Sequence, residues 1–126
     1  MDNKDLSNII RFMDYKIGKY LEPSYTDDEV IVMYTKGKQK ACFDVKNLFL
    51  KILYDKFQHV PLAKEDVLDL ILIMDSKKNN CDVKSLNTPN GLHDVSVKGQ
   101  SDLYSEVKGI LEDFLCEYDE ESLCQH

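Results

Sequence analysis

The carboxylates near the C-terminal end of the chain are the residues whose types and spacing most clearly indicate a chemistry. Asp102, Glu106, Asp113 and Glu117 follow one another at helical intervals through Gly109, so a helix would gather them on one side. Like charges four residues apart destabilise a helix, and no lysine or arginine on this side relieves the repulsion. A sequence selected only for folding would alternate the signs, so we expect this acidic stripe to bind a basic protein surface.

The predicted partner-binding residues are the acidic stripe and its immediate neighbours: Asp102, Glu106, Asp113, Glu117, Tyr118, Glu120 and Glu121. From Asp102 onward the chain carries eight acids and only Lys108, which places the whole net charge of −7 in its last fifth. This end therefore attracts cationic proteins and disfavours direct binding to nucleic acid or to an anionic membrane. The alternative is a solvated helix face that only keeps the protein soluble.

The residue patterns that would indicate a metal site or a catalytic nucleophile are weaker than the acidic stripe. Cys116, Cys124 and His126 are chemically suitable zinc ligands, but the two cysteines are eight residues apart, beyond the usual spacing of roughly two to four. No motif joins Cys42 to a base, and no phosphate loop, dinucleotide fingerprint or hydrolase motif occurs in the chain. We therefore predict no metal, no cofactor and no catalysis, with a small enzyme of scattered site residues as an alternative.

The element that must position the acidic stripe is a helix from Ser101 to Tyr118, with Ser101 as its N-cap and a continuous apolar face opposite the acids. An amphipathic helix is expected over Asp5–Leu21. The most apolar part of the chain, Val45–Met74, is expected to supply the core through helices Val45–Phe57 and Lys64–Met74. A buried strand over Leu70–Met74 is an alternative, because short apolar runs do not distinguish the two structures.

Two segments predict β-hairpins. The β-branched run after Glu29, the pair Lys36-Gly37 and the segment ending at Phe43 indicate the first hairpin. Val83–Leu86 and Leu92–Val97, around a Thr-Pro-Asn-Gly turn signal, indicate the second. The predicted fold class is therefore α+β, with about four helices packed with one or two β-hairpins around the Val45–Met74 core.

The bulk composition predicts one soluble domain. A chain of 126 residues with 43% hydrophobic and 31% charged residues suits a single globular domain, here residues 1–118, followed by an acidic C-terminal tail, residues 119–126. No apolar stretch reaches the ~20 residues needed to cross a bilayer, and the N-terminal residues lack a signal pattern. We expect a cytoplasmic protein with reduced cysteines, whose oligomeric state the sequence leaves open.

These expectations combine into a non-catalytic intracellular protein that binds a basic protein partner through its acidic C-terminal helix and inhibits it by covering its cationic surface. In size, charge and its acid-and-tyrosine helix, the chain is similar to the small acidic immunity proteins, which neutralise a nuclease toxin. That resemblance implies a nuclease toxin as the partner, but no family motif matches, so it carries over no residues. The second hypothesis is an adaptor or regulatory subunit that binds through an apolar groove.

Overall fold

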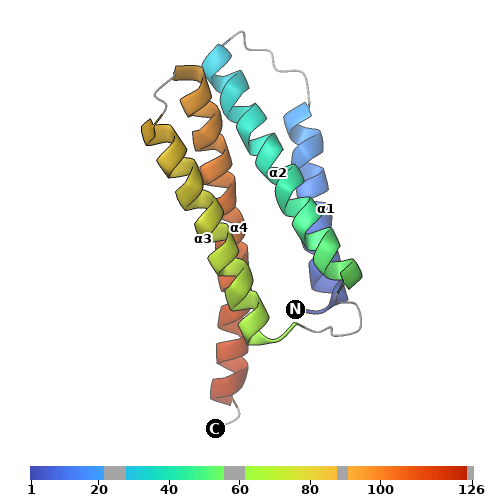
Figure 1. Ribbon diagram of the computed structural model, residues 1–126. Helices are drawn as coiled ribbons and strands as arrows, with labels where there is room; N and C mark the ends of the chain where they lie inside the picture. Colours follow the sequence, from blue (N-terminus) through green and yellow to red (C-terminus); the bar gives the residue numbers. More distant parts are fainter. Residues whose placement is uncertain (22–27, 56–61, 88–90, 125–126) are drawn as a thin grey trace.

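The chain folds as four helices, and the computed structural model contains no strand among the residues that it describes (Figure 1). Those residues are 1–21, 28–55, 62–87 and 91–124, of which 21, 84–87, 91–93 and 118–124 are described by their helix only. The helices are α1 (Asn3–Leu21), α2 (Glu29–Asp55), α3 (Lys64–Asn87) and α4 (Gly91–Cys124). They run alternately up and down, so α2 and α4 are parallel to each other (Figure 1). The predicted α+β fold is therefore wrong.

The first predicted hairpin is replaced by the N-terminal half of α2. Asp28 caps this helix: its carboxylate accepts a hydrogen bond from the Val30 N–H at 2.9 Å and its carbonyl accepts one from the Val32 N–H at 3.1 Å. The β-branched residues that suggested a strand are half-exposed on the helix, where they cost little. Packing of the later turns of α2 decides the structure, because the buried residues of the helix recur at helical spacing: Gly37, Ala41, Cys42, Val45 and Phe49.

The second predicted hairpin is also wrong, because its strands lie within two long helices. Val83–Leu86 continues α3 and Leu92–Val97 belongs to α4, while the turn signal at residues 88–90 lies outside the described residues. Ser101 does not cap a helix. It is buried within α4, and its hydroxyl donates a hydrogen bond to the Asp82 carboxylate of α3 at 3.1 Å. Ser101 thus binds the neighbouring helix α3, and the segment around it continues α4 instead of forming a loop.

Other helix predictions are confirmed. α1 covers the predicted segment, and reciprocal hydrogen bonds fix its start: the Asp5 N–H donates to the Asp2 carboxylate at 2.8 Å, and the Asp2 N–H donates to the Asp5 carboxylate at 3.0 Å. α3 begins at Lys64 as predicted, with the Asp66 carboxylate accepting the Ala63 N–H at 3.1 Å. Leu70–Met74 is helix and not strand. Phe57, the predicted end of the second helix, lies outside the described residues.

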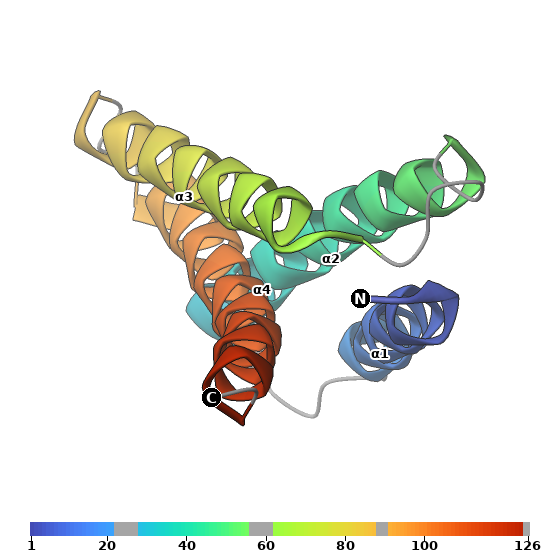
Figure 2. The same cartoon turned by 90° about the horizontal axis from the view of Figure 1, so that it is seen from below.

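The close contact between α2 and α4 sets the shape of the molecule. A Cβ added to Gly37 would overlap the carbonyl oxygen of Ser96, and one added to Gly99 would overlap that of Tyr34, so the two backbones touch at these glycines. Buried residues spaced by four along α2 then increase in size from Gly37 through Ala41 and Val45 to Phe49. The two helices accordingly lie side by side at their N-terminal ends and diverge toward their C-terminal ends (Figures 1 and 2).

The core draws on all four helices and not mainly on Val45–Met74. Its largest fully buried side chains include Leu6 and Met13 of α1, Phe49 of α2, Met74 of α3 and Leu103 of α4. α4 packs against both α3 and α2, whereas α1 packs chiefly against α2. Parts of the predicted core are exposed, since Leu72 is 64% exposed and Tyr54 is 73% exposed. The apolar pattern predicted more burial than the structure shows, because α3 packs mainly against α4 and leaves its other side exposed, and because Tyr54 lies at the C-terminal end of α2.

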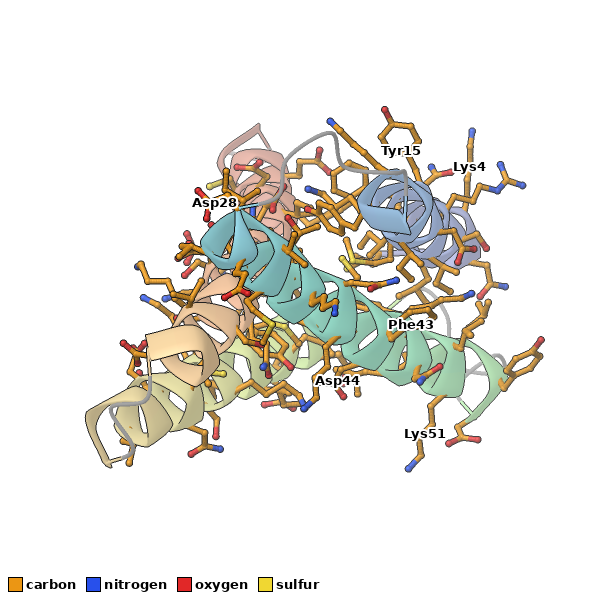
Figure 3. The ribbon with its side chains drawn as sticks, turned by 90° about the horizontal axis from the view of Figure 1, so that it is seen from above. Lys4, Tyr15, Asp28, Phe43, Asp44 and Lys51 are labelled. Carbon is orange, nitrogen blue, oxygen red and sulfur yellow. The ribbon has the colours of Figure 1, made fainter. Side chains whose placement is uncertain are left out.

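A partly buried polar cluster links α2, α3 and α4. The Tyr104 hydroxyl donates to the Asp44 carboxylate at 2.8 Å, and the Lys77 ammonium lies 2.8 Å from the same oxygen. Asp44 lies on the side of α2 that faces α3 (Figure 3). Burial opposes ionisation of Asp44, but hydrogen bonds from Lys77 and Tyr104 outweigh it and lower the pKa of that carboxyl. The cluster therefore fixes the mutual position of three helices through one carboxylate.

A helix that crosses a membrane must be both long and predominantly apolar. Among the described residues, no helix is both long enough and apolar enough to cross a membrane.

Candidate functional site

The predicted acidic stripe lies along α4, and the structure divides it into two parts. Asp102 and Glu106 form contacts with other helices, whereas Asp113 and Glu117 are exposed toward the C-terminal end. The side chains of Tyr118, Glu120 and Glu121 lie outside the described residues, although α4 continues as a helix to Cys124. The C-terminal part of α4 projects beyond the ends of the other helices (Figure 1).

Asp102 is bound within the molecule. Its carboxylate accepts a short hydrogen bond from the Tyr34 hydroxyl of α2 and lies 3.6 Å from the Lys98 ammonium one turn earlier in α4. The hydrogen bond to Asp102, together with burial, raises the pKa of Tyr34 to about 12. Asp102 therefore helps to hold α2 against α4 near the glycine contact, and is only partly available to a partner.

Glu106 joins α4 to α1 through Lys16. The Lys16 side chain is 14% exposed, forms an ion pair with Glu106, and its ammonium lies 5.0 Å from the centre of the Phe12 ring. Burial opposes the charge of Lys16, but the hydrogen bond from it to Glu106 and their attraction outweigh burial and raise the pKa of Lys16. An acid of the predicted stripe thus already binds a lysine, supplied by the chain itself.

Lys108 neutralises acids on another side of α4. Its ammonium lies 2.7 Å from Asp75 of α3 and 3.7 Å from Glu112. Within the part of the chain that the structure describes, no residue forms an ion pair with Asp113 or Glu117. These two carboxylates, four residues apart, therefore keep the mutual repulsion that the sequence indicated.

An apolar groove between α1 and α4 begins next to the Lys16–Glu106 ion pair. It has a volume of about 280 Å³ and is lined by Asp5, Asn8, Ile9 and Phe12 of α1 and by Ile110 and Phe114 of α4. Binding pockets for small molecules span roughly 300–1,000 Å³, so this groove suits one or two inserted side chains better than a cofactor. On α4, Asp113 and Glu117 lie beside its wall, since each is three residues from Ile110 or Phe114.

The groove residues were not predicted as a site, and no signal in the sequence was sufficient to find them. Phe12 falls outside the apolar stripe with which α1 packs on the core, and it remains 38% exposed. A single exposed aromatic residue does not by itself indicate a contact surface, and only the structure shows that Phe12 joins Ile110 and Phe114 in one groove. Ile110 and Phe114 gave no signal either, because they continue the apolar face of α4 that the core also uses.

Three other candidates lie outside the acidic stripe: Cys42, a hollow between α2 and α3, and the possible metal ligands. Cys42 is fully buried, and burial raises the pKa of its thiol to about 11. A hollow of about 180 Å³ between α2 and α3 includes Asp66 and Asp69, but Asp66 caps α3. No group of three potential metal ligands occurs in the described residues, and the predicted alternative ligands Cys124 and His126 lie outside that set of side chains.

Replacing Tyr34 by phenylalanine is expected to lower the free energy of unfolding by about 1 kcal/mol at neutral pH, because Asp102 loses its hydrogen bond. The raised pKa of Tyr34 means that the unfolded tyrosine ionises first, so this contribution is complete below pH 10.0 and is lost as the pH approaches about 12. Urea unfolding between about pH 9 and pH 12 should show the difference between wild type and Tyr34→Phe shrinking. Tyr15→Phe, at a position 66% exposed, is the control, and a difference independent of pH would contradict the assignment.

Searches against protein-family models, curated protein sequences and solved structures each found no match.

Proposed function

We propose that this chain is a non-catalytic protein-binding module that binds a basic protein through the C-terminal part of α4. The carrying observation is the contrast along the acidic stripe. Asp102 and Glu106 bind Tyr34, Lys98 and Lys16 of the same chain, whereas Asp113 and Glu117 are exposed without an ion pair from any described residue.

Electrostatics supports a basic partner over other classes of ligand. The acids of α4 repel phosphate groups, so nucleic acid and anionic lipid are poor ligands for this surface. A Lys/Arg-rich protein surface would remove the repulsion between Asp113 and Glu117 and would be attracted over roughly 10 Å at moderate ionic strength. A partner whose cationic surface binds its own substrate would be inhibited when α4 covers that surface.

Affinity capture from lysate of the source cell tests the proposal when it compares matched charge variants. The double variant Asp113→Asn/Glu117→Gln removes the exposed acids of α4, and the control Glu65→Gln/Asp69→Asn removes two exposed acids of α3. Both variants have the same net charge. We expect wild type and the α3 control to retain one basic protein that the α4 variant binds roughly fivefold more weakly, with a flatter salt dependence.

Two results would contradict the proposed function. One is that the retained protein is acidic or neutral. The other is that the α3 and α4 variants retain a basic partner equally well, because the surplus charge and not its position would then determine binding.

A further inference from the structure

The groove between α1 and α4 combines apolar walls with an acidic margin. Ile9, Phe12, Ile110 and Phe114 supply its apolar walls, and Asp5 lies at its end nearest the start of α1. The exposed acids Asp113 and Glu117 lie beside the α4 wall. α1 and α4 run antiparallel and do not pack closely there, which follows from the divergence of α2 from α4 (Figures 1 and 2).

One end of the groove already shows how a cation binds beside it. The Lys16 ammonium lies 5.0 Å from the centre of the Phe12 ring and pairs with Glu106, so one cation contacts both an aromatic ring of α1 and an acid of α4. Farther along α4, Phe114 and Ile110 stand beside Glu117 and Asp113 in the same combination of apolar and acidic side chains. The chain supplies a lysine at the first position, and no described residue supplies one at the second.

We propose that this groove receives an amphipathic helix of the partner protein, with one or two large apolar side chains inserted between α1 and α4 and lysine or arginine residues along the edge that faces Asp113 and Glu117. A helix suits the site because two antiparallel helices form a groove into which a third packs with side chains three or four residues apart. The charge of the margin favours a basic edge and excludes an acidic one. This inference rests on the proposed function and adds the structure that the partner presents.

A synthetic peptide of about 18 residues tests the inference directly, a length at which an isolated helix can form. It carries Leu, Leu and Trp at i, i+4 and i+7 and lysines along one flank. The chain contains no tryptophan, so the peptide's own fluorescence reports its burial without interference. Two further peptides serve as probes: one with glutamate in place of lysine, and one with the same composition but without the apolar stripe. We expect only the first peptide to bind, with a blue-shifted emission.

Matched protein variants locate the binding site. Phe12→Ala and Phe114→Ala change the groove walls, and each is expected to weaken binding at least tenfold. Leu72→Ala, which truncates an exposed apolar residue on α3, is the control and should change affinity less than twofold. Asp113→Asn/Glu117→Gln should weaken binding about fivefold and flatten its salt dependence. Circular dichroism and urea unfolding verify that each variant folds, and amide chemical shifts of wild type map the contact independently of any substitution.

Several outcomes would overturn the inference. The groove is not the site if Phe12→Ala and Phe114→Ala bind normally, or if the amide shifts centre on α3. Equal binding of the glutamate peptide would eliminate the basic edge. Absence of binding by the lysine peptide up to about 1 mM would eliminate the helical occupant. A dimer of wild type that Phe12→Ala dissociates would identify a second copy as the occupant. In each case the proposed function is tested separately, by whether the chain retains a native basic partner in the affinity capture.

Discussion

Replacing Gly37 by alanine is expected to lower the free energy of unfolding by about 3 kcal/mol. A Cβ at this position would overlap the carbonyl oxygen of Ser96 and lie 2.8 Å from its carbonyl carbon. Both atoms belong to the backbone of α4, so no side chain can rotate away and the two helices must separate. Separation at this point would loosen the packing of the buried residues farther along α2. Gly99→Ala should act similarly, because its Cβ would lie 3.1 Å from the backbone nitrogen of Lys38.

Two other helical glycines provide matched controls. Gly18 of α1 and Gly109 of α4 have nothing within 4 Å of an added Cβ. Alanine at either position should leave stability unchanged or raise it by up to about 1 kcal/mol, because alanine favours a helix more than glycine does. Urea unfolding followed by far-ultraviolet circular dichroism measures all four variants. A Gly37→Ala protein as stable as Gly18→Ala would show that α2 and α4 do not touch there.

Replacing Phe49 by alanine is expected to cost about 3–5 kcal/mol. Phe49 is the largest fully buried side chain among the described residues and belongs to the C-terminal part of α2, where that helix has diverged from α4. Its removal leaves a cavity that the flanking helices can fill only by moving together. The same urea experiment measures the loss, and Phe49→Leu should retain most of the stability because it keeps most of the apolar volume.

Phe43→Ala is the matched control for this second variant. Phe43 lies on the same helix but is 44% exposed, so its truncation should cost about 1 kcal/mol at most. Equal losses at positions 43 and 49 would contradict the assignment of Phe49 to the core.

Strong periodicity explains which elements could be predicted. Apolar residues of α1 and of α4 after Ser101 recur at helical spacing, and most of those with described side chains belong to the core or pack against it. Asn47, Lys51 and Asp55 are spaced by four on α2 and are all exposed, so they form one polar side of that helix (Lys51 in Figure 3). In these segments the local pattern and the tertiary packing indicate the same structure, so the sequence alone was sufficient.

The hairpin over Glu29–Phe43 was predicted from a pattern with two meanings. A glycine between β-branched and polar residues is typical of a turn, but a glycine within a helix also permits close contact with another helix. What distinguishes the two structures is the contact of Gly37 with the backbone of Ser96, a residue far away in the sequence. Because local propensities differ by only a few tenths of a kcal/mol per residue, packing against α4 determined the structure of this segment.

In the candidate site, too, some features follow from the local sequence and others only from tertiary packing. The sequence by itself determined that the C-terminal helix has an apolar face and that the acidic excess lies along it, because both follow from residue type and helical spacing. Only the tertiary structure decided which acids remain exposed, since Asp102 binds Tyr34 from 68 positions away and Glu106 binds Lys16 of α1. It also decided that an apolar groove lies beside Asp113 and Glu117. The physical reason is that the spacing of the helices depends on residue sizes where they meet, at Gly37 and Gly99, and helical periodicity carries no information about which helices meet.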